Sequence, residues 1–322
     1  MKLSFEQIKS ITAGALDVWK DEKGIRFSSC TPKQVEAWYK VEEILGYRSE
    51  TTAGVKLDFY TNSNTFSFTI HDHGQMETRY EVYVDNALCY YYFEDDFKES
   101  ITKTIALDGK EHRITLYLPS HGIGILGAVE IDDGATLKPH TYDRKMLIIG
   151  DSITQGWDST WDSLSYANHV SRFFNAYSII QGIGGARFHD TTFDEAIDYE
   201  PEIIIVAYGT NDWALHPSFE EAKKHCKGYL DQLVKRYPDA RIFGITPIWR
   251  GDKDTDTAVG SFVNYVSYLA DELRFHGITV IDGENLVPHL PEFFMDEYLH
   301  PDTKAFGVYS VNLIEKLNGY LK

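Results

Sequence analysis

Two patterns of apolar and polar residues divide the chain. Between about residues 26 and 130, apolar and polar positions alternate, as in FSFTI at 66–70, and turn pairs such as Asp108-Gly109 separate the alternating segments. Alternation with a period of two, interrupted by such turns, is typical of short antiparallel strands that bury one face. We therefore expect an antiparallel β-sandwich of the jelly-roll kind here, after a short N-terminal helix that Ser4 and Gln7 would cap.

Beyond residue 145, continuous apolar runs replace the alternation. Five such runs end at polar or glycine-containing segments; they lie at 146–149, 177–180, 203–206, 242–245 and 278–281. Runs of this kind suit parallel strands buried on both faces, and the segments between them have helical periodicity. We expect a doubly wound α/β domain with about five parallel strands between two helix layers. The polar segment 132–139 separates the two patterns, so we place the domains at 1–140 and 141–322.

An excess of acidic residues narrows the range of partners. The 322 residues include 49 acidic and 31 basic side chains, which gives a formal net charge of −18. A negative field of this size repels phosphate backbones and anionic lipids, so we expect neither a nucleic acid nor a membrane as a partner. No stretch approaches the roughly 20 apolar residues that a membrane span requires.

Cysteine usage and the first residues bear on location. Cys30, Cys89 and Cys226 have no paired spacing, which favours a reducing compartment over a disulfide framework. The opening residues MKLSFEQIK place charged and polar side chains where a signal peptide needs an unbroken apolar core. The sequence as written therefore predicts a cytoplasmic protein and leaves its oligomeric state open.

Residues suited to catalysis cluster directly after the predicted strands and before the last predicted helix. There are four such blocks: Gly150-Asp151-Ser152, Gly182-Ile183-Gly184-Gly185, Gly209-Thr210-Asn211-Asp212 and His300-Pro301. The carboxyl ends of parallel strands meet at one edge of a sheet, and sites in α/β folds form there. The sequence therefore predicts that the four blocks converge.

The four blocks, in this order, resemble those of the SGNH or GDSL-type hydrolases. The resemblance covers about residue 145 to the C-terminus and implies a three-layer, flavodoxin-like domain. It implies that Ser152 is a nucleophile and that His300 is the base that removes its proton, without which a serine hydroxyl reacts poorly. The backbone amides of Ser152 and Gly185 and the side chain of Asn211 would then stabilise the oxyanion that forms when an ester carbonyl is attacked.

The acidic member of a catalytic triad stays open at this point. The family usually carries Asp three residues before the histidine, where this chain has Glu297, and Asp296 lies one residue earlier. We favour Glu297 by register, with Asp296 as the alternative. In a third possibility a backbone carbonyl orients His300 in a Ser/His dyad, as in some family 2 carbohydrate esterases.

Four tryptophans follow the predicted strand ends and admit two interpretations. Trp157, Trp161, Trp213 and Trp249 either belong to the core or line an acyl or sugar pocket. Two sequence patterns that imitate ligand sites are rejected. The GxGxxG letters at 122–127 precede a predicted strand rather than a helix, and the Asp-rich segment from 252 lacks the Gly and Glu of a calcium loop. We expect no metal and no cofactor.

These features predict a serine esterase. A β-sandwich ahead of an SGNH domain resembles family 2 carbohydrate esterases, so the expected reaction is removal of small acyl groups, above all acetyl, from a small-molecule or oligosaccharide ester. Two alternatives remain: a lipase, arylesterase or thioesterase of the same superfamily, and a carbohydrate-binding protein without catalysis.

Overall fold

The computed structural model describes residues 1–71, 78–94 and 100–321, and it divides into two compact units. The first unit contains Met1–Cys30 and Glu50–Tyr142, and the second contains Thr31–Ser49 and Asp143–Lys322. These units differ from the predicted domains at residues 31–49, which group with the C-terminal part of the chain. Hydrogen bonds hold this segment there, since Thr31 Oγ1 donates to Asp194 Oδ2 at 2.7 Å and Gln34 pairs with Gln181.

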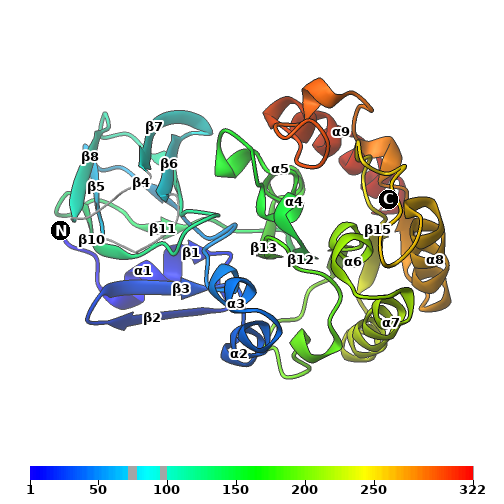
Figure 1. Ribbon diagram of the computed structural model, residues 1–322. Coiled ribbons are helices and arrows are strands. Elements are labelled where there is room, and N and C mark those ends of the chain that lie inside the picture. The colour runs from blue at the N-terminus through cyan, green and yellow to red at the C-terminus, as the bar shows by residue number, and fades with distance from the viewer. Residues whose placement is uncertain (72–77, 95–99, 322) are drawn as a thin grey trace. The chain divides into compact units, whose positions relative to one another are not determined.

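The first unit is the predicted antiparallel β-sandwich (Figure 1). One sheet has the order β1-β4-β9-β6-β7, with β11 beside β4, and the other has the order β2-β3-β10-β5-β8. Apolar side chains that alternate along these strands, such as Phe59, Phe66 and Phe68, are fully buried in its core. The elements are α1 (Phe5–Ile11), β1 (Thr12–Ala13), β2 (Asp17–Asp21), β3 (Gly24–Ser28), β4 (Lys56–Thr61), β5 (Thr65–Ile70), β6 (Thr78–Val84), β7 (Ala87–Glu94), β8 (Ile101–Ala106), β9 (His112–Tyr117), β10 (Leu126–Ile131) and β11 (Lys138–Pro139).

The N-terminal helix α1 begins as predicted. Ser4 Oγ accepts a hydrogen bond from the backbone N–H of Gln7, and the Gln7 side chain accepts one from the backbone N–H of Ser4. This reciprocal capping satisfies two donors that the first turn of a helix leaves without partners.

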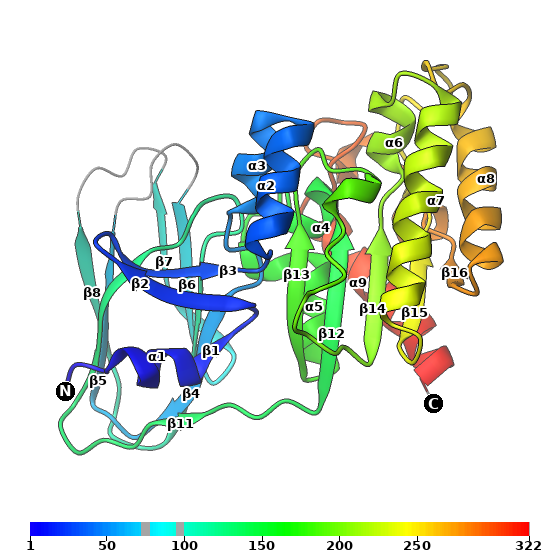
Figure 2. The same ribbon diagram turned by 90° about the horizontal axis from the view of Figure 1, so that it is seen from below.

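The second unit contains the predicted three-layer α/β domain (Figure 2). Its parallel sheet has the order β13-β12-β14-β15-β16, with α5 and α9 on one face and α7 and α8 on the other. The elements are α2 (Pro32–Val41), α3 (Glu43–Ser49), β12 (Arg144–Gly150), α4 (Ser152–Gln155), η1 (Asp162–Leu164), α5 (Tyr166–Phe173), β13 (Ala176–Gly182), η2 (Asp190–Thr192), β14 (Ile203–Ala207), α6 (Thr210–Leu215), α7 (Phe219–Arg236), β15 (Arg241–Ile245), α8 (Phe262–Phe275), β16 (Thr279–Ile281), η3 (Glu284–Leu286), η4 (Pro291–Phe293) and α9 (Thr303–Leu321).

The register of the parallel sheet brings the predicted blocks to one edge. Gly150, the last residue of β12, lies opposite Gly182 of β13 and Ala207 of β14. The three strands therefore end at the same level, and the residues that follow them emerge side by side.

Within the part of the chain that the structure describes, no helix combines the length and the apolar character that crossing a membrane would need.

Candidate active site

Ser152 is the first residue of α4, directly after the tight turn that joins β12 to this helix. Asp151 caps the short helix α4, since its Oδ1 accepts a hydrogen bond from the Ile153 N–H at 2.9 Å. A Cβ at Gly150 would lie 2.0 Å from Oγ1 of Thr154, so the turn closes only with glycine at this position. The Ser152 hydroxyl is thereby held at the carboxyl edge of the sheet.

His300 lies against Ser152, although 148 positions separate them in the chain. The distance from Ser152 Oγ to His300 Nε2 is 2.9 Å, within hydrogen-bond range. An imidazole at this distance can take the proton of the hydroxyl as it attacks a carbonyl carbon. The structure thus brings together the two residues that the sequence predicted as nucleophile and base.

A carboxylate faces the other nitrogen of the His300 ring. Asp296 Oδ2 lies 2.8 Å from His300 Nδ1, while Oδ1 of the same carboxylate accepts hydrogen bonds from the backbone N–H groups of Tyr298, Leu299 and His300. Partial burial acts to raise the pKa of Asp296, but these backbone donors and the nearby His300 outweigh it and hold the pKa below its usual range. Asp296 therefore stays ionised and can orient the imidazole with its proton on Nδ1.

The acid at His300 is thus the alternative from the sequence, Asp296, and not the favoured Glu297. Glu297 is exposed and has a left-handed backbone with φ of 66°. It lies in a loop that a backbone bridge between Phe294 and Pro301 closes. The short Asp296 side chain can fold back onto the next backbone amides, as in Asx turns, and it stands four residues before the histidine rather than the expected three.

The three predicted oxyanion donors follow neighbouring strands. Ser152 is the first residue of α4, where backbone N–H groups have no partner within the helix. Gly185 has φ of 85°, and its N–H donates to no group among the described residues. Asn211 Nδ2 donates to the Ala186 carbonyl oxygen at 3.0 Å, which places the amide beside Gly185. An amide carries two protons, so the second remains for a substrate oxygen.

Two buried hydrogen bonds hold the segment that carries Gly185, residues 183–189, which we call the Gly185 loop. The N–H of Gly184 donates to Gln155 Oε1 of α4 at 2.8 Å. The N–H of Phe188 donates to Asp212 Oδ1 of α6 at 3.0 Å. The Gly185 loop is therefore fastened to the helix that begins with Ser152 and to the helix that carries Asn211.

Arg48 of α3 borders the site and was not predicted. Its Nη1 donates to the Gly184 carbonyl oxygen at 2.8 Å, and its guanidinium lies 5.1 Å from the centroid of the Trp157 ring. A Cβ at Gly185 would lie 3.3 Å from Nη1 of Arg48, so the cation adjoins one of the predicted oxyanion donors. No local motif marks Arg48, because it belongs to a helix far from the four blocks in the chain.

Asp158 is a second residue near the site that the sequence analysis missed. Its Oδ2 lies 3.7 Å from His300 Nδ1, beyond hydrogen-bond distance but close enough to add negative charge beside the ring. Asp158 has a left-handed backbone with φ of 68°, a conformation in which Asp is over-represented.

The four tryptophans fall into different surroundings. The Trp157 ring is tilted against His300, with centroids 6.3 Å apart. Trp213 is 1% exposed, and its Nε1 donates to the Gly260 carbonyl oxygen, so it belongs to the core. Trp249 packs on Phe294, and Trp161 is half-buried just before η1. The structure therefore places Trp157 at the site and Trp213 in the interior.

Asp151 has an unusual environment for a carboxyl group. It is 2% exposed, and burial raises its pKa to about 7, with the charge of Asp212 adding to the effect. The Ile153 N–H and the Arg250 guanidinium act in the opposite direction. Since a free Asp titrates near pH 4, the folded chain holds a proton at Asp151 between about pH 4 and 7 that the unfolded chain releases.

The raised pKa of Asp151 predicts a pH-dependent loss of stability. Its neutral form stabilises the folded state at low pH, and this contribution disappears as pH rises from about 4 through 7. Asp151→Asn keeps the cap acceptor for Ile153 without the titration. We expect the free energy of unfolding of the variant, relative to that of wild type, to be larger at pH 8 than at pH 5. Urea denaturation at both pH values measures this difference, and an equal difference at the two would contradict the assignment.

Comparison with known proteins agrees with this geometry. Residues 148–306 match the GDSL-like Lipase/Acylhydrolase family, so the resemblance predicted from the four blocks is confirmed. No curated protein sequence matches the chain.

Several solved structures have the same fold as this chain over nearly its whole length. Salicylyl-acyltransferase SsfX3 from a tetracycline biosynthetic pathway has a TM-score of 0.76 and 18% identity, covering 96% of this chain and 95% of that one. A putative GDSL-like lipase from Bacteroides ovatus has a TM-score of 0.73 and 16% identity, covering 100% and 98%. A family two carbohydrate esterase from Clostridium thermocellum, in complex with cellohexaose, has a TM-score of 0.68 and 17% identity, covering 96% and 98%. At such identities the likeness establishes the fold, and the chemistry must be argued from the site.

Proposed function

For a chain whose residues 148–306 belong to the GDSL-like lipase/acylhydrolase family, we propose the function of a serine esterase that removes small acyl groups, above all acetyl, from carbohydrates. The observation that carries the proposal is the 2.9 Å distance between Ser152 Oγ and His300 Nε2, with Asp296 at the opposite ring nitrogen. Such an arrangement activates a hydroxyl for attack on an ester without a metal or a cofactor.

The proposed reaction has two halves. His300 takes the Ser152 proton while Oγ attacks the ester carbonyl, and the amides of Ser152, Gly185 and Asn211 stabilise the resulting oxyanion. The tetrahedral intermediate then collapses, and the sugar alcohol leaves with the proton from His300. In the second half His300 activates water, which cleaves the acyl-serine and releases the acid.

The surroundings of Gly185 support a small, polar substrate. Arg48 presents a cation beside Gly185, and the Trp157 ring lies 5.1 Å from that guanidinium and 6.3 Å from the His300 ring. A charged group beside the site suits a sugar ester better than a long alkyl chain, since covering a charge with hydrocarbon removes it from water at a cost. The carbohydrate esterase with this fold was solved with cellohexaose, which adds to the argument by analogy.

Acyl transfer to an alcohol is a second candidate. The salicylyl-acyltransferase has a TM-score of 0.76 to this chain. Transfer uses the same acyl-serine and differs only in which hydroxyl, that of water or of an acceptor, attacks it in the second half. The outcome depends on the access of each to the acyl-serine.

Acyl-chain length provides the test of the proposed function. We expect 4-nitrophenyl acetate to be hydrolysed with a higher kcat/KM than the octanoate, and acetylated xylo- or cello-oligosaccharides to lose acetyl units in mass spectra. The same spectra, recorded with an added acceptor alcohol, separate hydrolysis from transfer. A preference for the octanoate would overturn the acetyl-esterase proposal in favour of a lipase or thioesterase. If the protein hydrolysed neither ester, the alternative of a carbohydrate-binding protein without catalysis would replace it.

A further inference from the structure

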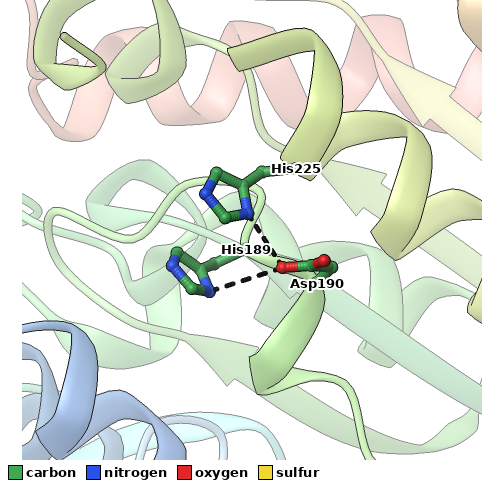
Figure 3. A group of neighbouring side chains, drawn as sticks. All are labelled: His189, Asp190 and His225. Atoms are coloured by element: carbon green, nitrogen blue, oxygen red, sulfur yellow. Dashed lines mark hydrogen bonds and ion pairs between the residues drawn. The ribbon is translucent and has the colours of Figure 1, made fainter. Parts of the chain in front are cut away.

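A second cluster of chemically active side chains lies outside the Ser152 site. His189 ends the Gly185 loop, Asp190 begins η2, and His225 comes from α7 (Figure 3). One ligand atom from each of the three lies within 4.8 Å of the others. Asp190 Oδ1 is 2.8 Å from Nδ1 of His225 and 3.9 Å from Nδ1 of His189. Two imidazole nitrogens thus face the same carboxylate oxygen, as the dashed lines of Figure 3 show.

The imidazoles of His189 and His225 lie face to face. The two imidazole rings stack with centroids 4.0 Å apart and planes 22° apart, an arrangement that two imidazolium cations would oppose. A neutral imidazole offers a lone pair in the plane of its ring, so a divalent cation at the ring edges, beside Asp190, can take one nitrogen from each histidine.

A further carboxylate orients His225. Glu221, one helical turn earlier on α7, places Oε2 3.5 Å from His225 Nε2. Once a metal replaces the proton at Nδ1, the remaining ring proton lies on Nε2, where the Glu221 carboxylate can hold it. This carboxylate–histidine pairing is common around zinc, and it is a separate observation from the convergence of the three ligands.

We propose that His189, Asp190 and His225 bind one Zn²⁺ ion. Two nitrogens and one carboxylate oxygen match the donors of zinc sites, and the partial exposure of Asp190 leaves room for a water as the fourth ligand. Binding displaces the proton on His225 Nδ1 and the hydrogen bond between His189 Nδ1 and the Thr191 hydroxyl. The ion joins η2 to α7 and so anchors the Gly185 loop; it takes no part in ester cleavage.

The test measures zinc binding to the full-length, metal-stripped protein. We expect one equivalent of Zn²⁺ bound through this cluster, by calorimetry and by elemental analysis after gel filtration, and a rise in the unfolding temperature on adding ZnCl₂. His225→Gln should weaken this binding about 100-fold and abolish the rise, and Asp190→Asn should weaken it in the same direction. Glu221→Gln should weaken it about tenfold, since it removes only the orienting carboxylate.

Two control variants locate the ion. His112 also contacts two carboxylates, Asp85 and Asp108, but through opposite ring nitrogens, so they cannot share one ion with it, and His112→Gln should bind zinc as wild type does. Asp158, Asp296 and His300 also lie close enough together to hold a metal ion. If the zinc binds at His189, Asp190 and His225 instead, His300→Gln should still bind one equivalent of Zn²⁺. Absence of zinc from the wild type, or an equivalent lost in His300→Gln but kept in His225→Gln, would overturn the proposal. If His225→Gln fails to fold, the Asp190 and Glu221 variants decide.

Discussion

Replacing Ser152 with Ala is expected to lower kcat for an aryl acetate by about 10⁶-fold, the scale on which loss of a triad nucleophile acts. The substitution removes only Oγ, the atom that lies 2.9 Å from His300 Nε2. Asp151 still caps α4, because that hydrogen bond uses the backbone of Ile153. The fold should therefore survive, and circular dichroism and the unfolding temperature check that it does.

A matched serine controls for loss of a buried hydroxyl. Ser171 of α5 is buried in the same unit, and its hydroxyl donates to the Ala167 carbonyl oxygen at 2.7 Å. Ser171→Ala should retain the activity of the wild type, at a small cost in stability. Equal hydrolysis by the Ser152 and Ser171 variants would remove Ser152 from the mechanism and with it the proposed acyl-serine.

Asp296→Asn is expected to lower kcat about 10³- to 10⁴-fold, while Glu297→Gln leaves it nearly unchanged. The Asn carbonyl can still accept the backbone N–H groups of residues 298–300, so the loop keeps its shape. Its NH₂ group then faces His300 Nδ1 and forces the ring proton onto Nε2. An imidazole protonated at Nε2 cannot accept the proton of Ser152.

The comparison of these two neighbouring acids separates the triad from its alternatives. Steady-state kinetics on one aryl acetate, with both variants and wild type at the same pH, gives the ratio of each variant's kcat to that of wild type. A large loss of kcat in Glu297→Gln with little loss in Asp296→Asn would restore Glu297, which stands three residues before His300, as the acid of the triad. Small losses in both would indicate a dyad, or the use of Asp158, which lies 3.7 Å from His300 Nδ1.

Local sequence patterns predicted the helices and strands of both units because the spacing of apolar residues reflects which faces of each element are buried. Alternation in segments such as 66–70 follows from one buried face, and the continuous runs of the second unit follow from burial on both faces of a parallel sheet. Capping residues such as Ser4 act on amides within a few positions, so their partners could be named in advance.

The site was predictable where residues directly follow strands. Ser152 follows β12, Gly185 follows β13 and Asn211 follows β14, and parallel strands of matched register bring their ends together. His300 was predicted through its resemblance to a known block, and the structure places it at Ser152. The substrate was not predictable in this way, since its contacts come from side chains around the site.

The sequence by itself determined the strands, the helices and the edge of the sheet at which Ser152, Gly185 and Asn211 gather. Only the tertiary structure decided that Asp296 and not Glu297 faces His300, that Arg48 lies beside Gly185, and that His189 stacks on His225. The physical reason is the range of the interactions. Periodicity and capping depend on neighbours along the chain, whereas these contacts depend on loop backbone geometry and on helices brought together by packing, which no local pattern encodes.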